Sequence, residues 1–96
     1  MKKHKRYVAF KSWGNARAFI ILEDRQISVH GRLYTSNNEF RYGPHVIIGE
    51  IPNDTIFNEI HQRKCMCDTK SKELEAYINN VWKQAKQKQS WFNYPL

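Results

Sequence analysis

The sequence predicts a single α+β domain, with an antiparallel meander of about five strands followed by two C-terminal helices that pack on one face of the sheet. Two features of the 96-residue chain carry this prediction. The first half contains short segments with apolar residues at every second position, which is the period of a half-buried strand. The last third has apolar residues at helical spacing. Strands that all precede the helices are typical of the α+β class.

Turn residues separate the expected strands. These span residues 7–13, 16–22, 27–35, 40–42 and 45–51, with Gly14-Asn15 as a two-residue hairpin turn and Gly43-Pro44 at the end of the fourth strand. The third strand has the clearest alternation. One of its faces carries Ile27, Val29, Gly31, Leu33 and Thr35, and the other carries Ser28, His30, Arg32 and Tyr34. We expect the helices to cover the apolar face and to leave the polar face open.

Two helices follow the strands. Asn53 or Asp54 caps the first, over residues 55–63, and Asp68, Thr69 or Ser71 caps the second, over residues 71–88. The second helix has a full apolar stripe of Leu74, Tyr77, Ile78, Val81, Trp82 and Ala85. We therefore divide the chain into a flexible basic arm at residues 1–6, the domain at 7–89, and an aromatic C-terminal tail at 90–96.

Positive charge is concentrated at the two ends of the chain. The 16 Lys and Arg against 9 Asp and Glu give a formal charge of +7. Residues 1–22 carry six basic residues and no acidic one, and residues 76–96 carry three lysines and no acidic residue. The segment between them has seven basic and nine acidic residues. Basic ends attract polyanions such as RNA, DNA, an anionic membrane or an acidic protein.

The polar face of the third expected strand is the most informative surface for function. His30, Arg32 and Tyr34 lie in line on it, and Lys11 and Trp13 or Arg17 join them if the neighbouring strand is antiparallel. Such a face suits single-stranded nucleic acid, because bases stack on rings and phosphates contact Lys and Arg. The leading hypothesis is a small, non-enzymatic accessory protein that binds RNA or single-stranded DNA. Its expected binding residues are Lys2, Lys3, Lys5, Arg6, Lys11, Trp13, Arg17, His30, Arg32, Tyr34, Lys83 and Lys86.

Two other functions stay open. The chain is alternatively a protein–protein interaction module or inhibitor, of viral or mobile-element origin, that meets an acidic partner through its basic ends and aromatic tail. The second alternative is a metal-independent ribonuclease, in which His30 moves the proton of a 2′-hydroxyl, Arg32 holds the phosphorane charge and Tyr34 orients or donates. His4, His45 and His61 supply candidates for a second acid or base. The sequence has no phosphate-binding loop and no nucleophile elbow.

Cys65 and Cys67 are the only cysteines, and their spacing is too short for an ordinary structural disulfide. We expect two thiols. With His61, and with His45 or Asp68 as the fourth ligand, they resemble a zinc site in composition, but structural zinc sites usually use paired Cys-x₂₋₄-Cys motifs. We therefore expect no metal and no cofactor. The chain has no apolar run of about 18 residues and no signal-peptide core, so we expect a cytoplasmic protein without a transmembrane segment.

Overall fold

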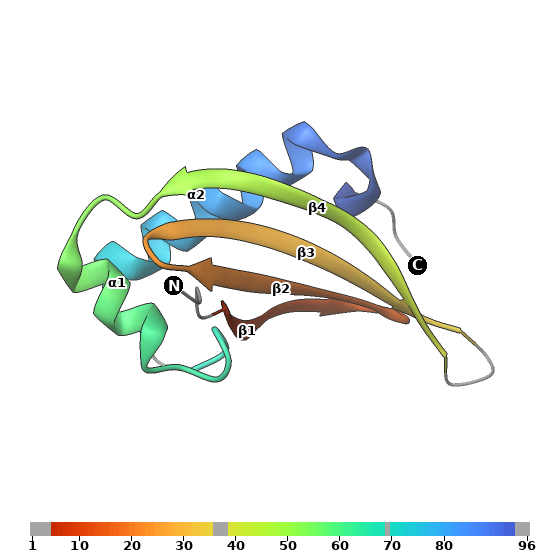
Figure 1. Ribbon diagram of the computed structural model, residues 1–96, viewed down its shortest axis with the longest axis horizontal. Helices are drawn as coiled ribbons and strands as arrows, with labels where there is room; N and C mark the ends of the chain where they lie inside the picture. The colour runs from red at the N-terminus through yellow and green to blue at the C-terminus, as the bar shows by residue number, and fades with distance from the viewer. Residues whose placement is uncertain (1–4, 36–38, 69, 94–96) are drawn as a thin grey trace.

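The computed structural model describes residues 5–35, 39–68 and 70–93. Four strands come first, β1 (Lys5–Trp13), β2 (Ala16–Glu23), β3 (Gln26–Tyr34) and β4 (Phe40–Glu50). Helix α1 (Asp54–His61), helix α2 (Lys72–Lys88) and a 3₁₀ helix, η1 (Ser90–Asn93), follow them. The strands form one antiparallel sheet in the order β1-β2-β3-β4 (Figure 1). The predicted α+β class and the meander are confirmed.

The sheet has four strands in the described residues rather than the expected five. Residues 40–42 and 45–51 were expected to be two strands, but residues 40–50 form β4 as one strand that runs through Gly43-Pro44. β4 is an edge strand, where a proline can be accommodated because one side of the strand has no ladder to interrupt. The pairing with β3 shifts register at this point, which absorbs the irregular residues.

Strand β1 contains a β-bulge that redirects its side chains. Ala9 pairs with Phe19 and Lys11 pairs with Ala18, so that Phe10 is the extra residue. Strict alternation places Lys11 and Trp13 on the face opposite Phe10. The bulge instead turns them toward the side of the buried residue Ala18, and the Trp13 ring packs against the hydrophobic core.

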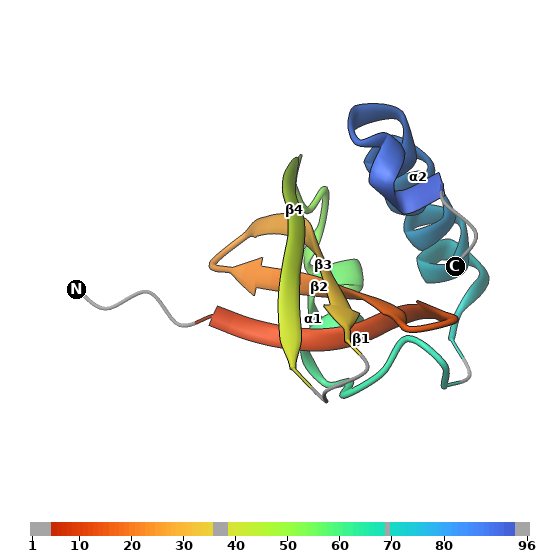
Figure 2. The same ribbon diagram turned by 90° about the vertical axis from the view of Figure 1, so that its right-hand side faces the viewer.

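Apolar side chains from the strands and both helices form one hydrophobic cluster. It contains Val8, Ile20, Val29 and Val46 from the four strands, Ile56 and Ile60 from α1, and Leu74, Ile78, Val81 and Ala85 from α2. The apolar stripe predicted for the last helix is confirmed, with its two aromatic members half-buried against the cluster. Figure 2 shows α2 to one side of the strands. That both helices pack on the same face of the sheet stays a prediction.

Side chains cap both helices at their first turn. The Asn53 side-chain oxygen accepts a hydrogen bond from the Ile56 N–H at 2.9 Å, and the Ser71 hydroxyl accepts one from the Leu74 N–H at 3.1 Å. Each cap satisfies a backbone donor that has no partner within the helix. Thr69, one of the expected caps, lies outside the described residues. No helix of the described chain is long and apolar enough to cross a membrane.

The segment after α2 packs its aromatic side chains on the sheet. Phe92 is buried in the hydrophobic cluster and Trp91 is half-buried against it. A Cβ atom on Gly31 would lie 2.4 Å from Cζ3 of Trp91, and one on Gly43 would lie 2.9 Å from Cζ2. The two glycines of neighbouring strands therefore leave the space that the indole occupies.

We predict that Gly31→Ala lowers the free energy of unfolding by about 1–3 kcal/mol, the usual range for overpacking, because the added methyl group meets the Trp91 ring. Urea unfolding of the wild type, Gly31→Ala, Trp91→Ala and the double variant forms a complete cycle. In the Trp91→Ala background the glycine change should cost much less. Equal losses in both backgrounds would contradict the packing of η1 on β3.

Candidate functional site

One face of the sheet gathers aromatic and basic side chains from all four strands. We call it the aromatic face, made up of Tyr7, Arg17, Phe19, His30, Arg32, Tyr34, Tyr42 and His45. The pairing of the strands brings them together, because Phe19 lies opposite His30, His30 lies opposite His45, and Arg32 lies opposite Tyr42. None of these residues belongs to the hydrophobic cluster, whose strand residues point the other way.

Arg32 lies at the centre of the aromatic face, among rings of three other strands. Its guanidinium carbon is 4.7 Å from the ring centroid of Phe19 in β2, 5.5 Å from that of Tyr7 in β1 and 5.7 Å from that of Tyr42 in β4. Arg17 contacts Tyr34 in the same way, at 5.6 Å. A guanidinium among rings is held by cation–π attraction. Nη1 of Arg17 also donates hydrogen bonds to the Gly14 and Ala16 carbonyls, at 3.3 and 2.9 Å.

Two histidines lie beside this arginine. The ring centroids of His30 and His45 are 5.8 Å apart, and those of His30 and Tyr42 are 5.5 Å apart. Nε2 of His45 lies 2.8 Å from Oγ of Ser28, a buried side chain. Partial burial lowers the pKa of His30 below its ordinary value, and the charges of His45 and Arg32 lower it further. A lowered pKa favours the neutral imidazole at pH 7.

Large apolar side chains are exposed on the aromatic face and beside it. Of the described residues, four such side chains are exposed, namely Tyr42 at 73%, Ile47 at 54%, Tyr7 at 46% and Tyr34 at 37%. Ile47 pairs with Ser28 and so shares this side of the sheet with the three tyrosines. Exposed apolar side chains gathered in one area are typical of an interaction surface.

The expected binding residues divide between this face and other parts of the molecule. Arg17, His30, Arg32 and Tyr34 lie on the aromatic face. Lys11 and Trp13 do not join them, because the bulge in β1 turns them toward α2. The Nζ atoms of Lys11 and of Lys86, another expected binding residue, both lie near the Trp82 ring.

The other expected basic residues are spread out. Lys5 and Arg6, which were assigned to the flexible arm, begin strand β1, and Nη2 of Arg6 donates a hydrogen bond to the Arg63 carbonyl at 3.1 Å. Lys83 is exposed on α2. Lys2 and Lys3 lie outside the described residues.

Sequence reasoning missed three aromatic members of the face, Tyr7, Phe19 and Tyr42. Each comes from a different strand, and each lies beside Arg32 only through strand pairing. The available signal was the alternation within each strand. That signal shows which residues share a face of one strand but not which residues of neighbouring strands meet.

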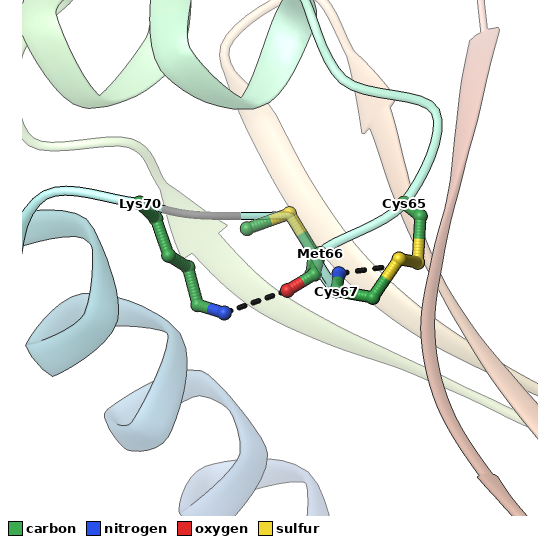
Figure 3. Close-up of a disulfide and its surroundings, with 4 residues drawn as sticks. All are labelled: Cys65, Met66, Cys67 and Lys70. Carbon is green, nitrogen blue, oxygen red and sulfur yellow. Dashed lines mark hydrogen bonds between the residues drawn. A yellow bond between two sulfur atoms is a disulfide. The ribbon is translucent and has the colours of Figure 1, made fainter.

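The expectation of two thiols is wrong, because Cys65 and Cys67 form a disulfide. Their Cα atoms are 5.2 Å apart, within the range that a disulfide spans, because the loop turns tightly between them. Figure 3 shows the bridge together with two contacts of its loop. The Cys67 N–H donates to Sγ of Cys65 at 3.1 Å, and Nζ of Lys70 donates to the Met66 carbonyl at 2.6 Å.

The disulfide also bears on the alternative of a zinc site, because it involves two of the candidate ligands, Cys65 and Cys67. Bonded sulfur atoms are not thiolates, and zinc binds thiolates. Across residues 5–35, 39–68 and 70–93, no group of three or more His, Cys, Asp or Glu side chains is placed to hold a metal ion. Comparison with known proteins gives no further guide, because no family model, curated protein or solved structure matches this chain.

We predict that His30 titrates below the ordinary histidine pKa of about 6.5, and that Arg32→Gln raises this pKa, because it removes a neighbouring positive charge. NMR titration of the histidine ring signals measures the change. Arg41→Gln is the control, since it removes an exposed charge of the same sign from β4. A His30 pKa that responds equally to both variants would contradict the arrangement.

The lowered pKa of His30 also makes the free energy of unfolding depend on pH. Between the lowered pKa of folded His30 and the ordinary pKa of the unfolded chain, the unfolded state binds more protons, so His30 makes the fold less stable as the pH falls through this window. Well above the ordinary pKa of about 6.5, both states hold the neutral ring and this contribution disappears. His30→Gln should therefore remove part of the loss of stability on acidification.

Proposed function

We propose that the aromatic face binds single-stranded nucleic acid, RNA or DNA ahead of a duplex, and that the protein is a small non-enzymatic accessory protein. One observation carries the proposal. Exposed tyrosines share a face with Arg17 and Arg32, and both guanidinium groups lie against rings. Bases stack on rings, and arginines contact phosphates. Binding of this kind tolerates many sequences, because every base has a π-face.

The positions of the tyrosines and of Arg32 support a path for the nucleic acid that crosses the β-strands. Tyr7 and Tyr42 belong to the two edge strands of the sheet, and Arg32 lies within contact of both rings. Bases on the two tyrosines would leave the intervening phosphate near Arg32. In this proposal both helices cover the other face of the sheet, an arrangement supported by their shared cluster with the strand residues.

The proposal includes a cytoplasmic location, and it ranks nucleic acid ahead of an acidic protein as the partner. A nucleic-acid ligand fits a cytoplasmic protein. The structure has Cys65 and Cys67 as a disulfide, and the thiol pool of the cytoplasm would open this bond to two thiols. An acidic protein would be attracted by the same positive charges. It would not need exposed rings beside guanidinium groups, and for this reason we place nucleic acid first.

We predict that Tyr42→Ala weakens oligonucleotide binding by about 1–3 kcal/mol, the usual range for the loss of one stacking platform. The slope of log affinity against log salt should change little, because stacking is not ionic. Arg32→Gln should instead reduce that slope by roughly 0.7, since it removes one phosphate contact. Fluorescence anisotropy with a labelled single-stranded oligonucleotide at several salt concentrations measures both effects.

Two controls make this test specific. Tyr42→Phe keeps the ring and should bind as the wild type does. Replacing Lys2 and Lys3 by Gln should flatten the salt slope for all sequences alike, because these two charges would contact backbone phosphates rather than bases. Binding no tighter than millimolar at about 0.1 M salt, against nonspecific values of 10⁻⁴–10⁻⁶ M, would refute the proposal and leave the acidic protein partner.

The two histidines favour a second candidate function, RNA cleavage without a metal. Neutral His30 would take the proton of a ribose 2′-hydroxyl, whose oxygen would attack the adjacent phosphorus. His45, beside Ser28, would give a proton to the departing 5′-oxygen, and Arg32 would stabilise the phosphorane. The products would be a 2′,3′-cyclic phosphate and a 5′-hydroxyl, so the proton removed in the first step is matched by the proton given in the second.

For this second candidate, His30→Gln and His45→Gln should each slow RNA cleavage by about 10²- to 10⁴-fold while leaving binding close to that of the wild type. The substrate is a single-stranded RNA with fluorophore and quencher, in buffer containing a metal chelator. The same sequence in DNA lacks the 2′-hydroxyl and should remain intact. Tight binding of RNA without cleavage would exclude the second candidate and leave the first unaffected.

A further inference from the structure

A separate hollow lies between β1 and the C-terminal half of α2, on the side of the sheet that the β1 bulge exposes to α2. It is a shallow hollow, widely open to solvent, with a volume of about 430 Å³. Lys11 and Lys86 stand at this hollow, the rings of Trp13, Trp82 and Phe92 form apolar walls, and Ser12 and Asn93 complete the lining. None of these residues belongs to the aromatic face.

The two lysines place their charges over one ring. Nζ of Lys11 is 5.9 Å from the Trp82 ring centroid, and Nζ of Lys86 is 5.8 Å from it. Among the described residues, none that lines the hollow is acidic. The ion pairs found within the described residues involve arginine, and neither lysine takes part in them. Both ammonium groups therefore lie near the same indole ring, and neither has an ion-pair partner among the described residues.

The aromatic walls are fixed by edge-to-face packing. The centroid of Trp82 lies 5.6 Å from that of Trp13 and 5.7 Å from that of Phe92, both with steep interplanar angles. Trp13 in turn contacts Trp91 at 5.8 Å, and Trp91 is wedged over the two glycines of the sheet. The walls are thus part of the packed fold, and a ligand would meet a preformed surface.

We propose that this hollow binds the phosphate of a nucleotide. A phosphate monoester carries about −1.5 to −2 charges at pH 7, which matches two lysines, and each ammonium offers three donors to its oxygens. The aromatic walls and the volume leave room for the base beside the phosphate. The site does not depend on the aromatic face, so it can bind its ligand whether or not the first proposal holds.

Tryptophan fluorescence tests the site directly, because all three tryptophans of the chain lie in or beside it. We expect AMP to change the emission saturably and adenosine to have little effect, since adenosine lacks the phosphate. Lys11→Gln and Lys86→Gln should each weaken AMP binding at least about fivefold. Lys83→Gln is the matched control: it removes the same charge from the same helix at an exposed position away from the hollow.

The phosphate could belong to the end of a nucleic acid or to a free nucleotide. Two oligonucleotides that differ only in a 5′-phosphate or a 5′-hydroxyl distinguish these sources. Tighter binding of the phosphorylated strand, lost in Lys86→Gln, identifies the end of a nucleic acid as the ligand. Binding of AMP with no difference between the strands identifies a free nucleotide. Tyr42→Ala, on the aromatic face, should leave AMP binding unchanged, which keeps this test distinct from that of the first proposal.

Two results would overturn the inference. One is an equal response to AMP and adenosine, which would mean that the phosphate is not recognised. The other is a loss of AMP affinity in Lys83→Gln as large as that in Lys86→Gln, which would mean that net charge alone attracts the ligand. Thermal unfolding of the lysine variants verifies that they are folded.

Discussion

Burial of one face of the sheet fixes the register of its four strands. Side chains alternate along each strand, so Val8, Ile20, Val29 and Val46 enter one cluster only if neighbouring strands pair in the observed alignment. A shift by one residue would move a whole row of apolar side chains to the other face. The position of Arg32 among rings of three other strands follows from the same alignment, although Arg32 contributes nothing to the cluster.

The bulge in β1 is a local exception to this alternation. It places Lys11 on the side of α2, away from the basic residues of the aromatic face. The loop after α1 is attached at this point: the Ala9 N–H donates to the Lys64 carbonyl at 3.0 Å, and the Met66 N–H donates to the Ala9 carbonyl at 2.7 Å. These bonds also cover part of the edge of β1, which would otherwise present unpaired backbone groups. The disulfide loop, the bulge and the placement of Lys11 beside Trp82 are therefore one connected arrangement.

The features predicted from the sequence are those that local periodicity determines. The stripe of the last helix and the shared face of His30, Arg32 and Tyr34 follow from the spacing of residues within one element. The merging of the last two expected strands and the turn of Lys11 toward α2 depend on how a strand pairs with its neighbour, which spacing does not contain. The Cys65–Cys67 bridge likewise depends on the path of its loop.

The fold also changes the meaning of the charge pattern. The basic residues gather at the two ends of the sequence, and the structure brings Lys11 of the first strand and Lys86 of the last helix to the same indole. Arg17 and Arg32 lie elsewhere, against rings of the sheet. A planar guanidinium against a ring suits a stacked, extended polymer, whereas two compact ammonium groups in a hollow suit one small, highly charged group. The difference between the two cations is the physical reason to assign the two surfaces to different ligands.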